Sequence, residues 1–577
     1  MMPHPIRLLA VLRRPGKPLS SFALALLLAA CASTSPTSTD PEATAADESR
    51  GESESILAAE NALRDGDCRG AAENYLAAAR VSEQVDVATR ATELAVGCEQ
   101  LTTARVAVAR WRKLDPYSGD AALVEALVAL KRYDLEEART ALTAWRESGS
   151  AGTQDPVRFA QVLERESDAT AAHQVFGDVL VGEDPTADVL LAKAQLGMAA
   201  QDMRAAMDSA QRALQINTDM VEAQTLVLRA LSILGEHTAA IEGARALADS
   251  LEGEDVFLLA DLQAAAGRHE EARQELARLG AMPETRLGAE RRLIAIDLEE
   301  GNFDSAEARL GPLMGERGST AMALYFLGQL AEMRGDDARA VQNYRLLADS
   351  SIALSARTAA ARLLIKHGDR KNALALLDEY ATQNPEESIE VGAARAQLLA
   401  QDGDVDAALQ GLDALLLRYP DHPNLIYQRA TVLETGGRTR EAVATFEAAL
   451  KERPADPQLT NALGFTLADH NMKLSRAEQL IKDALKVSPD NPAIQDSMGW
   501  VLYRRGRTGE ALPILERAWT NSRDSEIAAH YGEVLWKAGD EGQARYIWQQ
   551  ALTRSPDHKG LRGTMARLTG EPAAAPR

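Results

Sequence analysis

Residues 442–454 read AVATFEAALKERP, residues 477–489 read AEQLIKDALKVSP and residues 544–556 read ARYIWQQALTRSP. Each stretch begins with alanine, carries an alanine–leucine pair seven residues later and ends at a proline. A small residue stands twelve or thirteen positions earlier (Ala430, Gly464 and Gly532), and a fourth block keeps the frame with Gly499, Ala511 and Ala518. Antiparallel helices approach closely only where small residues lie at the crossing, and proline ends a helix because it lacks an N–H. The pattern predicts repeated helix pairs between His422 and Pro556.

A second pattern extends the repeat through most of the chain. Glycine recurs with an alanine five positions later, at Gly235, Gly267, Gly301, Gly335, Gly368, Gly403, Gly437, Gly506 and Gly539. Successive glycines are 32 to 35 residues apart, except for one double step of 69 in which Asn471-Met472-Lys473 replaces the glycine turn. Glycine at this place predicts a turn with positive φ. Blocks of this length resemble the tetratricopeptide repeat (TPR), a helix–turn–helix unit. We therefore expect an all-α solenoid superhelix of about fifteen helix pairs and a closing helix near 559–568.

The match to the repeat divides the chain into segments. We assign a lipoprotein signal peptide to 1–30, a lipidated cysteine and flexible tether to 31–53, and divergent helical repeats to 54–220. Central repeats follow at 221–421, well-matched repeats at 422–556, and a capping helix with a tail at 557–577. The tether is predicted because residues 32–53 are rich in Ser, Thr, Pro, Asp and Glu and contain no large apolar side chain.

The first thirty-one residues have the layout of a secretion signal. Four basic residues precede a nine-residue apolar run at 22–30, which is too short to span a bilayer. The run ends in Leu-Ala-Ala-Cys at Cys31, which matches the bacterial lipobox. That resemblance implies a diacylglycerol thioether on Cys31, and Ala32 in place of Asp favours the periplasmic face of the outer membrane. The alternative is an ordinary secretory cleavage site with an incidental cysteine.

Two further cysteines lie in the turns of adjacent helix pairs. Cys68 and Cys98 are 30 residues apart, so stacking of the pairs would bring the two turns together. The periplasm permits oxidation, and we predict a disulfide. A disulfide that closes a loop of this length would stabilise the folded state by about 3–4 kcal/mol, because it restricts the unfolded chain. The alternative is two unpaired thiols on neighbouring helices.

Composition and motifs argue against nucleic-acid binding and catalysis. The net charge of −22 repels polynucleotides. His269-Glu270 could open a metalloprotease motif, but Arg273 stands where the second histidine belongs. We predict no enzyme, cofactor or metal site, and we interpret four of the histidines as turn or surface residues: His422, His470, His530 and His558. The alternative is an enzymatic domain hidden in the less regular stretch 117–220, which would require a non-helical fold.

Aromatic side chains are concentrated near the C-terminus of a chain that is otherwise poor in them. The residues concerned are Trp500, Tyr503, Trp519, Tyr531, Trp536, Tyr546 and Trp548. They form a possible partner-docking patch, because aromatic residues dominate interface energetics. The alternative is that they fill the core of the C-terminal repeats.

The C-terminal motifs suggest a family. The run DSMGWVLYRRGR at 496–507 and the run EIAAHYGEVLW at 526–536 look like those of proteobacterial TPR lipoproteins. With its length and lipobox, the chain resembles the outer-membrane lipoprotein adaptors of the periplasmic carboxyl-terminal processing protease. The resemblance implies a scaffold that binds and activates this serine protease and presents cell-wall hydrolases to it. The other hypothesis is a TPR scaffold for exopolysaccharide export or outer-membrane assembly.

Overall fold

The computed structural model describes residues 41–148, 156–181, 185–315, 319–347, 352–420, 422–555 and 558–570. The chain forms two compact units. Unit 1 comprises Met1–Thr153 with Leu416–His422, and unit 2 comprises Gln154–Leu415 with Pro423–Arg577. Cys31 and the predicted signal peptide lie outside the described residues.

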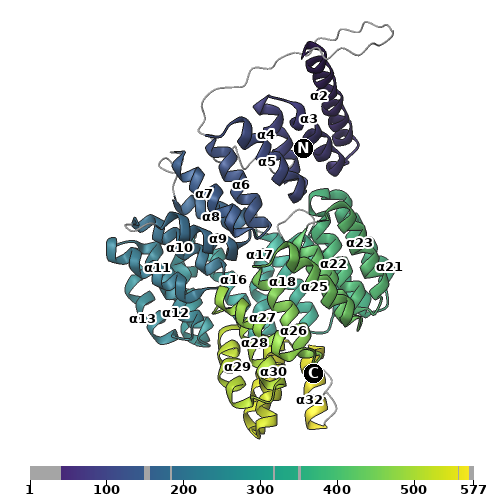
Figure 1. The fold of residues 1–577 in the computed structure, drawn as a ribbon. Helices are drawn as coiled ribbons and strands as arrows, with labels where there is room; N and C mark the ends of the chain where they lie inside the picture. The colour runs from purple at the N-terminus through teal and green to yellow at the C-terminus, as the bar shows by residue number, and fades with distance from the viewer. Residues whose placement is uncertain are drawn as a thin grey trace. The chain divides into compact units, whose positions relative to one another are not determined.

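Unit 1 consists of helices that pair in chain order (Figure 1). They are α2 (Pro41–Arg64), α3 (Cys68–Val81), α4 (Val85–Gly97), α5 (Leu101–Leu114), α6 (Gly119–Lys131) and α7 (Leu135–Glu147). Buried alanines dominate the contact layers, including Ala72, Ala88, Ala91 and Ala104. Small side chains let these helices pack closely, as the low aromatic content predicts.

Unit 2 also consists of helices, in two stretches; the last residues of α23, from Leu416, belong to unit 1. The first contains α8 (Pro156–Glu166), α9 (Ala169–Leu180), α10 (Ala187–Ala199), α11 (Met203–Ile216), α12 (Val221–Ile233), α13 (His237–Leu247), α14 (Leu258–Ala265), α15 (His269–Gly280), α16 (Arg286–Glu299), α17 (Phe303–Leu313), α18 (Thr320–Met333), α19 (Asp337–Arg345), α20 (Ala353–Lys366), α21 (Arg370–Gln383), α22 (Ser388–Gln401) and α23 (Val405–Arg418). The second contains α24 (Pro423–Thr435), α25 (Thr439–Glu452), α26 (Pro457–Asp469), α27 (Leu474–Val487), α28 (Pro492–Arg504), α29 (Thr508–Ser522), α30 (Ser525–Ala538), α31 (Glu541–Arg554) and α32 (Lys559–Thr569).

The predicted fold class is confirmed. Helices α2 to α31 form fifteen consecutive pairs and α32 follows them, with no strand in the described part of the chain. The described part of the stretch 117–220 consists of helices α6 to α11 joined by short turns and loops, with no non-helical domain among those residues.

The predicted glycine turns are confirmed. All nine glycines have φ between 71° and 94°, and the alanine five positions after each is completely buried. In the block without glycine, Asn471 and Lys473 adopt φ of 55° and 42°. Gly464 shows why a small residue is needed where two helices of a pair cross. A Cβ on Gly464 of α26 would lie 2.7 Å from Ile481 Cγ1 of α27, which is closer than carbon atoms pack.

The start of the first helix differs from the prediction. We expect a tether as far as residue 53, whereas α2 begins at Pro41 and runs for 24 residues. Proline suits the first turn of a helix, where its missing N–H needs no partner, and the alanines and glutamates that follow have high helix propensity. The prediction considered only the absence of apolar side chains, and therefore missed this propensity.

Within unit 2, residues far apart in sequence meet. The backbone N–H of Arg204 donates to Asp490 Oδ2 at 3.2 Å, and the guanidinium of Arg204 pairs with Oδ1 at 3.3 Å. Asn491 donates to the side-chain oxygen of Gln201 at 2.8 Å. The turn between α10 and α11 therefore touches the loop between α27 and α28, so the stack of helix pairs in this unit curves back on itself.

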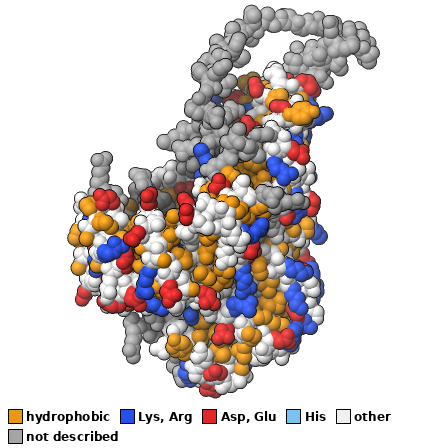
Figure 2. Space-filling model, turned by 90° about the vertical axis from the view of Figure 1, so that its left-hand side faces the viewer, with side chains coloured by type: hydrophobic (Ala, Val, Ile, Leu, Met, Phe, Trp, Pro, Cys, Tyr) orange, Lys and Arg blue, Asp and Glu red, His pale blue; other side chains and the backbone are white. Residues whose placement is uncertain are grey.

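Figure 2 shows acidic and basic side chains interspersed on one face of the molecule, with hydrophobic side chains in bands between them. No helix among those described is both long and apolar enough to cross a membrane.

Candidate functional site

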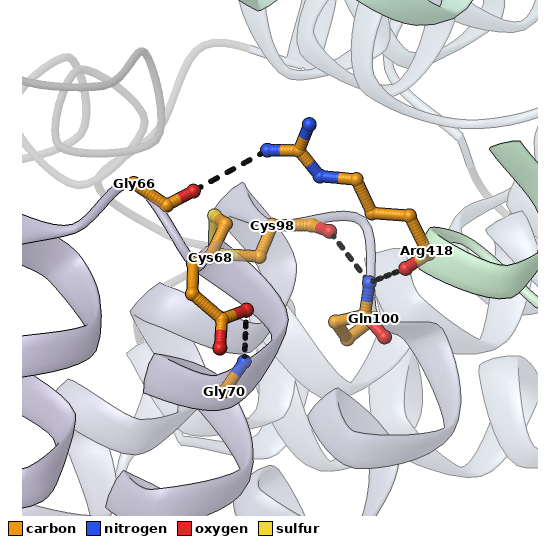
Figure 3. The surroundings of a disulfide bond; sticks show 7 residues. Gly66, Cys68, Gly70, Cys98, Gln100 and Arg418 are labelled. Atoms are coloured by element: carbon orange, nitrogen blue, oxygen red, sulfur yellow. Dashed lines mark hydrogen bonds between the residues drawn. A yellow bond between two sulfur atoms is a disulfide. The ribbon is translucent and has the colours of Figure 1, made fainter. Parts of the chain in front are cut away.

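The structure joins Cys68 and Cys98 in a disulfide (Figure 3). Their Cα atoms are 5.5 Å apart, Cys68 being the first residue of α3 and Cys98 following the end of α4. The side chain of Asp67 accepts from the N–H of Gly70 at 2.9 Å and caps α3, and Gln100 donates to the Cys98 carbonyl at 3.1 Å. The bond thus ties the α2–α3 turn to the α4–α5 turn, where stacking of the first two repeats predicts it.

Most of the predicted docking aromatics lie in the core. Trp500, Trp519, Tyr531 and Trp548 are buried in the cluster that spans α24 to α32. Trp548 is completely buried because its indole fills the space opposite Gly532. These four side chains therefore correspond to the core alternative and offer little surface to a partner.

The other three aromatics occupy different surroundings. Trp536 is half-buried and stacks on Trp548, with ring centroids 5.6 Å apart. Tyr546 is 54% exposed on α31, a second helix of its pair, and accepts a hydrogen bond from Gln550. Tyr503 lies on α28 and donates to Glu533 Oε1 at 3.2 Å. The seven residues consequently do not form one patch.

A second group of aromatic and charged side chains lies on α24, α26, α28 and α30, which are the first helices of the last four pairs. It comprises Tyr427, Glu434, Phe465, Asp469, Asp496, Trp500, Glu526 and His530. We call this surface the inner face. Phe465 of α26 and His530 of α30 approach to 5.7 Å between ring centroids, although α28 separates their helices in the stack. Alternate helices can touch in this way only on the concave side of a curved stack. Trp500 Nε1 also donates to Asp469 Oδ1 at 3.1 Å, which links α28 to α26.

An ion pair lies at the centre of the inner face. His530 Nδ1 and Asp496 Oδ2 are 2.7 Å apart, and both side chains are largely buried. The imidazole stacks on the Trp500 indole, with centroids 4.3 Å apart. Burial alone would lower the pKa of His530, but the adjacent Asp496 carboxylate outweighs it and raises that pKa to about 9. The histidine is therefore an imidazolium at neutral pH.

Two further carboxylates of the inner face, Glu434 and Glu526, interact more weakly with nearby histidines. Glu526 forms no ion pair with any described residue, and Glu434 comes only to 4.0 Å from His470 Nε2. Partial desolvation by the surrounding helices raises the pKa of both carboxyl groups, and the Glu526 carboxylate contributes to the raised pKa of Glu434 and of Tyr427.

The neighbouring acids are paired. Asp469 lies 3.6 Å from the guanidinium of Arg504, and Glu533 pairs with Arg567 of α32. No group of three or more His, Cys, Asp or Glu side chains in the described ranges is placed to hold a metal ion.

The prediction that His530 is a turn or surface residue is wrong, because it lies inside α30 and packs between rings. His470 follows the end of α26, and His558 precedes α32 and caps it. The sequence carried a signal for the inner face: interacting residues stand about one repeat apart. Asp496 and His530 are separated by 34 residues, and Asp469 and Trp500 by 31.

Comparison with known proteins finds a repeat family in part of the chain. The tetratricopeptide repeat family model matches residues 296–353, 393–457 and 427–492. These matches lie within the all-α solenoid of helix pairs, and they show that residues 296–353 and 393–492 are similar to tetratricopeptide repeats.

Individual relatives cover parts of the chain. It is 34% identical over 248 residues to the TPR repeat-containing protein PA4667 of Pseudomonas aeruginosa, across 43% of this chain and 42% of the relative. It is 26% identical over 168 residues to cellulose synthase operon protein C of Salmonella typhimurium, across 29% of this chain and 13% of the relative. The chain thus spans less than half the length of these curated relatives. Among solved structures, yeast Tom70 matches with a TM-score of 0.39 and 12% identity, across 72% of this chain and 94% of that one.

Proposed function

We propose that the protein is a membrane-tethered scaffold whose C-terminal repeats bind a segment of another protein. The inner face carries this proposal. Hydrogen bonds and ring contacts between α26, α28 and α30 hold it rigid, so little conformational freedom would be lost on binding. Tyr427 and Glu526 are exposed on this face and Glu434 is half-buried, so these side chains are available to a partner.

The lipobox supports the tether. A lipid on Cys31 would hold the body at the periplasmic face of the outer membrane, and more than one acyl chain is needed for stable anchoring. Replacement of Cys31 by serine should move the protein from the membrane pellet to the soluble fraction. A Cys31→Ser variant that stays in the pellet after a high-salt wash would refute lipid anchoring.

For the partner, we propose a periplasmic processing protease that the scaffold recruits and activates, together with cell-wall hydrolases that it presents as substrates. The resemblance of 496–507 and 526–536 to TPR lipoproteins supports this reading. A second candidate is a scaffold for exopolysaccharide export, which the similarity to cellulose synthase operon protein C favours.

A pull-down from solubilised envelope separates the two candidates. The bait is residues 32–577, with Tyr427→Ala as the inner-face variant and Tyr546→Ala as the control on an outer helix. Recovery of a protease with cell-wall hydrolases, lost only with the Tyr427 variant, supports the adaptor. Recovery of polysaccharide-export subunits without a protease refutes it, and equal recovery with all baits refutes binding at the inner face.

A further inference from the structure

The disulfide of unit 1 lies beside a segment from a distant part of the sequence. Residues Leu416–His422, which include the end of α23, belong to unit 1 together with the first helices. Two turns of unit 1 contact this segment, and they are the turns that Cys68 and Cys98 join (Figure 3). The disulfide is therefore placed to control how the two turns hold the segment.

The contacts are hydrogen bonds to carbonyl oxygens at the end of α23. The Arg69 guanidinium donates to the Leu417 carbonyl at 2.6 Å. The Gln100 side-chain amide donates to the Arg418 carbonyl at 2.8 Å and to the Cys98 carbonyl at 3.1 Å. Because the last carbonyls of a helix have no partner within the helix, these two side chains cap the end of α23.

Each half of this cap adjoins one half of the disulfide. Arg69 directly follows Cys68 in sequence, and Gln100 is two residues after Cys98. The disulfide keeps the Cα atoms of the two cysteines 5.5 Å apart, so that Arg69 and Gln100 reach successive carbonyls of one helix end. A longer hydrogen bond, of 3.5 Å, runs from the Arg418 guanidinium back to the carbonyl of the α2–α3 turn. Two of the three contacts to the segment thus depend on where the α2–α3 turn lies.

The α2–α3 turn can move once the bond is broken. Helices α2 and α3 meet the next pair mainly through α3, and the disulfide ties their turn to that pair. Cys68 is partly exposed, whereas Cys98 is buried. A dithiol reductant would therefore attack the Cys68 sulfur and release Cys98, and its second thiol would then free Cys68. Two electrons and two protons pass to the protein, which gains two thiols while the reductant becomes a disulfide.

We propose that the Cys68–Cys98 disulfide is a redox-sensitive clamp on residues 416–420. With the bond intact, the α2–α3 and α4–α5 turns cap the end of α23 together. Reduction by a dithiol separates the two turns, so the contacts of the α2–α3 turn are lost and the last turn of α23 frays. This clamp does not depend on the scaffold function proposed above.

Hydrogen exchange of the backbone amides at 416–419, followed by mass spectrometry, tests the clamp in the purified protein with and without dithiothreitol. We expect reduction to speed exchange at these amides about tenfold or more, because the disulfide no longer restrains the open form. The amides of α6, inside unit 1, should change less than about twofold. Equal exchange at 416–419 in both redox states would refute the clamp. A loss of protection in α6 as large as that at 416–419 would also refute it, since reduction would then unfold unit 1.

A variant that keeps the disulfide separates the clamp from a loosening of the fold. Arg69→Ala removes the donor to Leu417, and Glu73→Ala is the matched control, because it removes the 2.8 Å ion pair of Arg69 but leaves that donor in place. In oxidised protein, Arg69→Ala should speed exchange at 416–419 about threefold or more, and Glu73→Ala should leave it unchanged. After reduction, Arg69→Ala should match wild type, because the contact is already lost. An equal effect of Arg69→Ala in both redox states would overturn the link between the disulfide and the segment.

Discussion

Gly532 lies where α30 crosses α31, and its replacement by alanine should destabilise this pair of helices. A Cβ at this position would lie 2.5 Å from Trp548 Cε2 and 2.6 Å from Cδ1, much closer than carbon atoms pack. Trp548 is completely buried, so its indole cannot turn toward solvent to make room. The methyl group must therefore push the two helices apart.

The magnitude follows from two opposing contributions. Overpacking of a filled core costs about 1–3 kcal/mol. Alanine also gains about 1 kcal/mol over glycine in a helix interior, so the net loss should reach up to about 2 kcal/mol. Gly563→Ala is the matched control, because Gly563 lies in α32 with no atom within 4 Å of the added Cβ. The difference between the two variants isolates the overpacking cost.

Urea unfolding followed by circular dichroism, with hydrogen exchange of the α30 and α31 amides, measures this difference. We expect faster exchange in both helices for Gly532→Ala and unchanged or slower exchange for Gly563→Ala. Adding Trp548→Phe to the Gly532 variant should relieve the clash, with a coupling of about 1 kcal/mol. If Gly532→Ala stabilises the protein as much as Gly563→Ala does, the close crossing inferred for this repeat is refuted.

Three further predictions concern other parts of the chain. Replacing Cys68 and Cys98 by serine should lower the unfolding free energy of the first repeats by about 3–4 kcal/mol, and reducing agent should abolish the difference from wild type in urea unfolding; a difference that persists under reduction would contradict it. The folded-state pKa of His530 is about 9, above its ordinary 6.5, because of its pair with Asp496. This pair should contribute about 3 kcal/mol to the free energy of unfolding. The contribution should be complete below pH 6.5 and should disappear as the pH rises through 9. Stability measured from pH 6 to 10 should therefore fall more in wild type than in His530→Gln, and parallel curves would argue against the pair. Gly301→Ala should cost about 1–2 kcal/mol through its φ of 75° alone, since nothing lies within 4 Å; an unchanged urea midpoint would count against this.

The turns show how far sequence alone could define the repeats. From Gly235 onward, glycine marks nearly every turn, and the helix pairs could be placed within a few residues. Nearer the N-terminus the same positive φ occurs at Glu99 (53°), Tyr133 (58°) and Gln201 (58°). Those residues adopt the left-handed region because the packing of their helices imposes it, and a pattern based on glycine cannot detect them.

The inner face was harder to predict than the fold. His530 is charged and buried because Asp496, one repeat earlier, and the Trp500 ring enclose it. Neither neighbour is adjacent in sequence, so local pattern suggests a surface histidine. The aromatic residues posed the converse problem, since glycines at the crossings create the spaces that side chains such as Trp548 fill. Aromatic enrichment in a repeat of this kind therefore indicates core packing before it indicates a docking surface.

The bond between Arg204 and Asp490 has a consequence for how such a protein can evolve. Arrays of stacked units ordinarily gain or lose whole units with little effect, because each unit contacts only its neighbours. Here two turns 286 residues apart must meet, and they do so only with the present number of units between them. Duplication or deletion of one unit in that interval would move the two turns out of register. The copy number between Gln201 and Asn491 is thus under structural constraint.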